Sequence, residues 1–84
     1  MRYCFITIKS LTTAQRAESL LKRTGIHCTL QRSPRWMEEQ GCGNGLRVDC
    51  DDLSRAIATL RGNRISYNRA YLRQEDGEME ELAL

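Results

Sequence analysis

The 84-residue chain lacks the features of a membrane protein, a secreted protein and the common enzyme classes. Its longest apolar stretch, residues 3–8, is interrupted by a threonine and is too short for a membrane span or a signal peptide. We therefore expect a cytoplasmic location and no membrane partner. The sequence contains no Ser-His-Asp set, paired-carboxylate motif, Walker loop or dinucleotide-binding fingerprint. These absences favour an accessory protein over a stand-alone enzyme, and no cofactor is expected.

Histidine occurs once, and none of the four cysteines forms a C-x-x-C pair. Zinc-finger spacing is therefore excluded. A disulfide framework is not expected either, because the chain carries no secretory signal and has a plausible core without cross-links. A metal site built from Cys42, His27 and another cysteine is the weaker alternative, since a lone histidine on a strand usually faces solvent. We expect no metal.

The charges are distributed unevenly along the chain. Five of the 11 acidic residues lie in residues 75–84, which contain no lysine or arginine. The remaining chain has 13 basic and 6 acidic residues, a net charge of +7. We therefore expect one domain over residues 1–73 and a flexible acidic tail over residues 74–84. The charge pattern fits a solvated surface with a frayed end, or an anionic ligand whose access the tail modulates.

Hydrophobic spacing predicts four strands and two helices. The expected strands cover residues 2–8, 26–32, 46–50 and 65–72. Candidate helix caps are Ser10, Thr12, Asp51 and Asp52 at the starts and Gly25 and Gly62 at the ends. The order strand, helix, strand, strand, helix, strand in so short a chain predicts an α+β fold of the ferredoxin-like βαββαβ type. Right-handed crossovers would place both helices on one face of a four-stranded antiparallel sheet.

Strand alternation distinguishes three cysteines from the fourth. Cys4, Cys28 and Cys50 share strand faces with apolar residues, so we expect them to be buried. Cys42 lies between Gly41 and Gly43 in a long loop over residues 33–45, where no periodicity buries it. The loop geometry therefore favours an exposed thiol, although a loose hairpin loop whose cysteine has no role is the simpler alternative.

The surroundings of Cys42 favour anion chemistry. The flanking glycines permit positive φ and leave backbone N–H groups free to contact an anion. Arg32, Arg35 and Arg47 would favour the thiolate if the fold brings them close. Glu38 and Glu39 would oppose it. Trp36 in the same loop is either a packing anchor or a partner contact.

An ordered set of short segments resembles a known family. The segments are YCFITIKS at 3–10, AESLLK at 17–22, GI at 25–26, PR at 34–35, CG at 42–43 and DDL at 51–53. Together they resemble the putative Se/S carrier-like family of small bacterial proteins, formerly a domain of unknown function, over most of residues 3–72. The family usually has serines shortly before its cysteine, whereas this chain has Glu-Glu-Gln-Gly at 38–41.

The resemblance implies a cysteine that carries sulfur or selenium as a persulfide-type adduct and hands it to a partner enzyme. By position this group-carrying thiol is Cys42, with sulfur or selenium donor and acceptor proteins as partners. Pro34 and Arg35 would shape the base of the loop, and Arg35 could hold the anionic adduct through charge-assisted hydrogen bonds.

A non-enzymatic ligand- or RNA-binding regulatory module is the alternative function. An RNA reader would carry aromatic residues on its first and third strands. The first expected strand has Tyr3 and Phe5, but the third has none, so nucleic acid is not expected as a partner. Tyr67 and Tyr71 fit ordinary sheet packing. A homodimer is left open.

Overall fold

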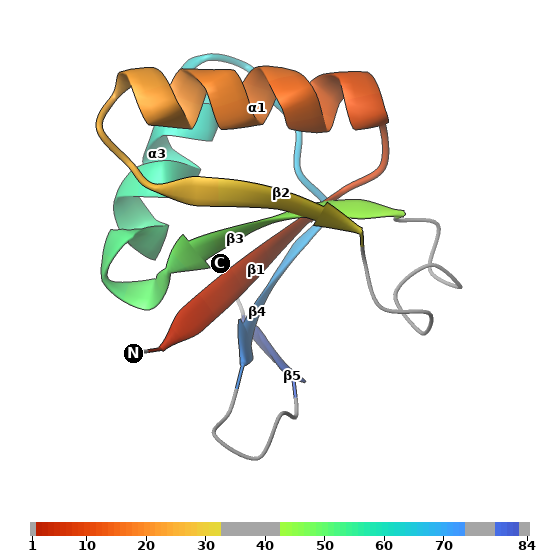
Figure 1. Ribbon diagram of the computed structural model, residues 1–84, viewed down its shortest axis with the longest axis vertical. Coiled ribbons are helices and arrows are strands. Elements are labelled where there is room, and N and C mark those ends of the chain that lie inside the picture. Colours follow the sequence, from red (N-terminus) through yellow and green to blue (C-terminus); the bar gives the residue numbers. More distant parts are fainter. Residues whose placement is uncertain (1, 33–42, 74–78, 83–84) are drawn as a thin grey trace.

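The computed structural model describes residues 2–32, 43–73 and 79–82. In chain order the elements are β1 (Tyr3–Ile8), α1 (Leu11–Arg23), β2 (Cys28–Arg32), β3 (Asn44–Asp49), the short 3-10 helix η1 (Cys50–Asp52), α3 (Leu53–Gly62), β4 (Arg69–Arg73) and β5 (Met79–Leu82). The strands form one antiparallel sheet in the order β2-β3-β1-β4-β5. Figure 1 shows both helices on the same side of this sheet. The expected α+β class with two helices is confirmed.

The expectation of a four-stranded sheet is wrong, because Met79–Leu82 adds the strand β5 beside β4. The acidic composition of this segment conceals two apolar side chains, Met79 and Leu82, which are half-buried against the cores. Glu81 also forms an ion pair with Arg69, with 2.7 Å between the guanidinium nitrogen and the carboxylate oxygen. The boundary at residue 73 between a domain and a flexible tail stays a prediction.

The main core lies between the two helices and one face of the sheet. Its buried members come from α1 (Ala14, Ala17, Leu21), α3 (Leu53, Ala56, Ile57, Leu60), β1 (Cys4, Ile6, Ile8) and β3 (Leu46, Val48), among others. The strand residues alternate in sequence and therefore point to one face, while the helical residues recur at intervals of three and four. Both helices are thus held by their apolar stripes, and their polar sides face solvent.

The opposite face of the sheet carries a smaller cluster. Phe5 and Tyr71 are each only 4% exposed, and Met79 of β5 packs against them. The Phe5 ring also lies directly over Gly45 of the neighbouring strand, where a Cβ atom would collide with it. The central strand β1 is therefore covered on both faces.

The start of β3 differs from the expected loop over residues 33–45. Asn44 and Gly45 are strand residues, and Gly45 pairs with Thr7 of β1 and Gln31 of β2. Glycine at this position is required by the close approach of the Phe5 ring and does not break the strand. The last expected strand is also shorter than predicted, since β4 begins only at Arg69.

The first helix begins and ends at two of the expected caps. The Ser10 hydroxyl oxygen accepts a hydrogen bond from the Thr13 backbone N–H at 3.3 Å. At the other end Gly25 has a φ of +84°, and the Ile26 N–H donates to the Leu21 carbonyl at 2.9 Å. This left-handed turn is the usual helix end at glycine, so the prediction for Gly25 is confirmed.

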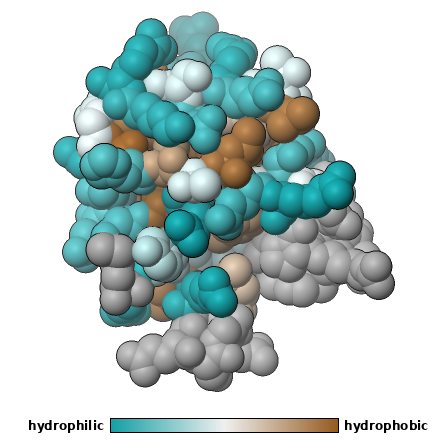
Figure 2. Space-filling model, in the orientation of Figure 1, coloured by the Kyte–Doolittle hydropathy of each residue, from teal (hydrophilic) through white to brown (hydrophobic). Residues whose placement is uncertain are grey.

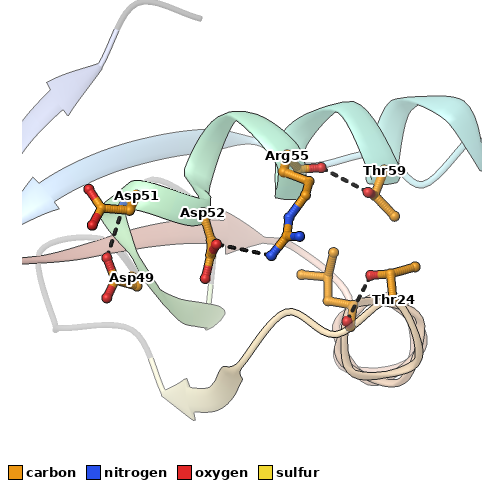
Figure 3. Close-up of polar contacts among 7 residues, drawn as sticks. Thr24, Asp49, Asp51, Asp52, Arg55 and Thr59 are labelled. Carbon is orange, nitrogen blue, oxygen red and sulfur yellow. Dashed lines mark hydrogen bonds and ion pairs between the residues drawn. The ribbon is translucent and has the colours of Figure 1, made fainter.

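The start of the second helical segment uses three aspartates in different ways (Figure 3). The Asp49 carboxylate accepts a hydrogen bond from the Asp51 N–H at 2.9 Å and caps η1. Asp52 occupies the N-cap position of α3, but its side chain makes no capping bond and pairs with Arg55 at 3.0 Å. Asp49, which sequence reasoning did not select, is therefore the residue whose side chain caps this segment.

The end of α3 corrects another expectation. Gly62 is the last helical residue and does not adopt a positive φ. The left-handed position is taken instead by Arg64, with a φ of 58°, and the Ile65 N–H donates to the Leu60 carbonyl at 2.9 Å. An arginine therefore occupies the position that glycine usually fills at the end of a helix.

We expect Gly45→Ala to lower the free energy of unfolding by about 1–3 kcal/mol, because the new Cβ would overpack the Phe5 ring. Gly62→Ala is the matched control, since no described atom beyond its chain neighbours lies within 4 Å of the position of its Cβ. Urea denaturation measures both. In a Phe5→Leu background the cost of Gly45→Ala should shrink. Equal costs of Gly45→Ala in the two backgrounds would contradict the proposed contact.

Candidate functional site

Most of the expected site residues fall on one segment of the chain. Cys42, the expected group-carrying thiol, lies outside the described residues, as do Pro34, Arg35 and Gly41. Trp36, Glu38 and Glu39 also lie outside them. Gly43 and Arg47 are described. The geometry of the site is therefore given by the part of the fold to which residues 33–42 are joined.

Three strands meet where this segment is attached. Arg32, the last residue of β2, is the Cα partner of Asn44, the first residue of β3. Asn44 is also the partner of Ile8, the last residue of β1. We call this end of the three strands, marked by Ile8, Arg32 and Asn44, the loop end of the sheet. The chain passes from Ile8 through Lys9 and Ser10 into α1, so the N-terminus of α1 lies at the same end (Figure 1).

Gly43 precedes β3 at the loop end and is half-buried. Among the described residues other than its chain neighbours, none has an atom within 4 Å of the position that a Cβ would take. No described residue beyond its neighbours therefore crowds this position.

Arg47 lies farther along β3. Its guanidinium carbon is 4.4 Å from the centre of the Tyr3 ring, on the sheet face that the helices leave uncovered. Arg47 follows Gly43 by four positions, which corresponds to about 13 Å along the strand at about 3.3 Å per position. The structure thus brings Gly43 to the loop end and stacks Arg47 on Tyr3 instead.

The loop end has a positive electrostatic character. Lys9 is exposed and lies directly before the Ser10 cap, and the first turn of α1 contains no acidic side chain. The unpaired N–H groups at a helix start carry a partial positive charge, which an adjacent lysine reinforces. This arrangement can stabilise an anion, such as a thiolate, near the attachment of residues 33–42.

A shallow cavity of about 290 Å³ lies beside this helix start. Its lining residues are Ile8, Lys9, Ser10, Thr13, Ser66, Tyr67 and Asn68. Sequence reasoning did not select Lys9 for the site. The sequence does place Lys9 between the expected first strand and the expected Ser10 cap, which is the signal that could have identified it as a positive charge at a helix start.

Two of the three described cysteines are buried, as expected. Cys4 is 2% exposed and Cys28 is 8% exposed, and both are free thiols. The Cys28 thiol donates a long hydrogen bond of 3.7 Å to the Glu18 carbonyl. The expected burial of Cys50 on a strand is wrong. The chain turns into η1 after Asp49, which leaves Cys50 half-buried at the edge of the core.

The environment of the buried thiols suppresses their reactivity. Burial, followed by the hydrogen bond that the Cys4 thiol donates to the neighbouring Cys50 sulfur, raises the pKa of Cys4 from 9.0 to about 12. Burial and the Glu18 carboxylate also raise the pKa of Cys28. Because the thiolate is the nucleophile, both cysteines are protonated and inert at neutral pH.

The described residues hold no group of three or more histidine, cysteine, aspartate or glutamate side chains that could bind a metal ion. His27, the histidine considered for such a site, is exposed. Within the same described parts of the chain, neither helix reaches the length and apolar character needed to cross a membrane.

Comparison with protein families gives a match over most of the chain. The family model described as "Putative Se/S carrier protein-like" matches residues 3–72, which include all of the four expected strands but residue 2, both helices and the segment 33–42. Searches of curated proteins and of solved structures give no match.

The raised pKa of Cys4 predicts a loss of stability at alkaline pH. Above pH 9.0 the unfolded chain releases the Cys4 proton, while the folded chain retains it up to about pH 12. The unfolded state then binds fewer protons, so the free energy of unfolding should fall as the pH rises through this range. Urea denaturation should show a steeper fall for the natural chain than for Cys4→Ala. Equal slopes would contradict the buried environment of this thiol.

Proposed function

Because the chain belongs to the Se/S carrier protein-like family, we propose that it carries sulfur or selenium as a persulfide-type adduct on Cys42. In the loading step the Cys42 thiol loses its proton, and the thiolate attacks the outer sulfur of a donor persulfide. A new S–S bond forms at Cys42, the donor S–S bond breaks, and the donor leaves as a thiolate. A partner enzyme then removes the outer sulfur by the same exchange.

The observation that supports this proposal is the positive charge at the loop end. Cys42 is covalently joined to Gly43, whose next residue, Asn44, pairs with Ile8 immediately before Lys9 and the α1 N-terminus. A lysine and a helix start both favour a thiolate, and the persulfide that forms from it is also an anion. The fold therefore supplies fixed positive charge where the carrier thiol is attached.

The burial of other thiols supports the same function. A persulfide exchanges with any accessible thiolate, so a carrier needs its remaining cysteines to be unreactive. The raised pKa values of Cys4 and Cys28 meet this need. Among the described cysteines only Cys50 is partly accessible.

Other expected residues have supporting roles in the proposal. Pro34 and Arg35 shape the base of the loop, and Arg35 holds the anionic adduct. Gly41 and Gly43 offer backbone N–H groups. Arg47 contributes positive charge from farther along β3, since its guanidinium group is stacked on Tyr3. Donor and acceptor proteins in the cytoplasm complete the cycle.

The sheet order also supports the finer fold assignment. The order β2-β3-β1-β4, with one helix in each of the connections β1 to β2 and β3 to β4, fits a ferredoxin-like arrangement extended by β5. Folds of this type host many functions, so the functional proposal depends on the site.

An RNA-binding module has less support. Base stacking needs exposed aromatic rings on the open sheet face. Phe5 and Tyr71 are each 4% exposed, and the Tyr3 ring is covered by the Arg47 guanidinium group. The described part of this face therefore offers no free stacking platform.

Incubation with glutathione persulfide should add the mass of one sulfur atom to the peptide that contains Cys42. Cys42→Ser should abolish this gain, because the accepting nucleophile is lost. Cys28→Ser is the matched control and should load as the natural chain does. Mass spectrometry of the intact and digested protein measures the result. Absence of sulfur from Cys42, or its accumulation on Cys50, would refute the proposal.

Lys9→Gln should slow the native-state alkylation of Cys42 about two- to fivefold, because a nearby charge that favours the thiolate is removed. Lys22→Gln is the control, since Lys22 lies in the last turn of α1 and faces Glu18 at 3.5 Å. Timed alkylation followed by peptide mass spectrometry gives the rates. The same rate in both variants would show that the loop-end charge does not act on Cys42.

A further inference from the structure

A second hollow lies farther along α1, between this helix and the turn that follows α3. Its volume is about 380 Å³. Its lining residues are Thr12, Gln15, Arg16, Ser19, Leu20, Arg23, Asn63 and Ile65. We call it the α1 groove. In Figure 2 the outer surface along α1 is mostly hydrophilic, with small apolar areas between the polar side chains.

The charge of the α1 groove is entirely positive. Arg16 and Arg23 are both exposed, and among the described residues no acidic side chain pairs with either of them. The described residues that line the groove include no aspartate or glutamate. Seven residues of helix place the two Cα atoms about 10.5 Å apart along the axis of α1. Two guanidinium groups thus face one hollow without a counter-charge.

A third arginine lies between two lining residues. Arg64 is exposed, falls between Asn63 and Ile65 in sequence, and adopts the left-handed φ of 58°. Glycine would fit this conformation better, so local backbone preference does not account for an arginine here. A functional need for positive charge beside the groove would account for it.

The shape and the uncharged lining indicate the kind of ligand. Leu20 is half-buried and Ile65 is buried, so the hollow has an apolar component between polar rims. Hydroxyl and amide groups of Thr12, Gln15 and Ser19 provide further hydrogen bonds. No aromatic side chain lines the groove on which a nucleic-acid base could stack.

We propose that the α1 groove binds an extended acidic segment of a partner protein. Its carboxylates would pair with Arg16 and Arg23, and an aliphatic side chain between them would rest on Leu20 and Ile65. Carboxylates four residues apart in an extended chain share one face with the residue midway between them. They are separated by about 13 Å, close to the spacing of the two arginines. Arginine suits this role because its planar group binds carboxylates through paired hydrogen bonds.

The acidic segment of the chain itself is a poor occupant of this groove. Its described part, Met79–Leu82, is paired with β4, and Glu81 is already bound to Arg69. The charge complementarity therefore points to another protein. This binding does not depend on chemistry at Cys42, so Cys42→Ser should bind as the natural chain does.

Fluorescence anisotropy with a labelled peptide of the repeat Glu-Ser-Leu-Ser, which places glutamate and leucine on one face of an extended chain, tests the proposal on the full chain. The natural chain should bind this probe, and the affinity should fall as salt is added. The double variant Arg16→Glu/Arg23→Glu should lose affinity about tenfold or more. The double variant Arg2→Glu/Arg73→Glu is the control, because it changes the net charge equally with two exposed arginines outside the groove. It should stay within about twofold of the natural chain.

Three outcomes would overturn the proposal. Equal loss in both double variants would show that binding follows net charge alone. Tighter groove-dependent binding of a short single-stranded RNA than of the acidic peptide would assign the groove to nucleic acid. Groove-dependent self-association, detected by analytical ultracentrifugation, would assign it to a second copy of the chain. Circular dichroism confirms that each variant is folded.

Discussion

The central strand β1 must be covered on both faces, and the rest of the structure follows from this constraint. Every residue from Cys4 to Ile8 is buried. The two helices supply the apolar cover on one side, as the βαββαβ order requires. The other side has no helix, so Phe5 and Tyr71 form their own cluster, which Met79 of β5 completes. The acidic fifth strand is therefore held in the sheet by its two apolar side chains. Met79 packs against the Phe5–Tyr71 cluster, and Leu82 packs against the main core.

The same strand fixes the geometry of the loop end of the sheet. Its antiparallel register with β3, and that of β3 with β2, aligns Ile8, Asn44 and Arg32 at one edge. A shift of one residue would turn every buried side chain to the wrong face, so the register is strongly determined. Only two residues separate the end of β1 from the start of the helix that covers it, which brings a positive helix start to the loop end. Core formation and the electrostatics of the proposed site are thus consequences of one arrangement.

Sequence patterns predicted those features that depend on periodicity. The α+β class, both helices, the Gly25 turn and the burial of Cys4 and Cys28 follow from spacing alone. The misses depend on contacts between distant residues. Gly45 was assigned to a loop because the Phe5 ring above it comes from another strand. The sequence predicts no strand at Met79–Leu82, because the charge of this segment outweighs its two apolar residues in any local average. Lys9 becomes a site candidate only when the ends of three strands are known to meet.

Cys50 is the described cysteine that could compete with Cys42 for sulfur, because its thiol is partly accessible. It is half-buried, hydrogen-bonded to the Cys4 thiol, and could in principle accept a sulfur atom from a persulfide. Its position works against this transfer, because it follows the last residue of β3, whereas Cys42 precedes the first. The six residues of β3 span about 17 Å, far more than the length of the S–S bond that the transfer must form. Within one chain β3 therefore separates Cys50 by the full length of a strand from the point where the segment of the proposed carrier thiol is attached. Under the proposed function, this separation limits the loss of sulfur to the chain itself.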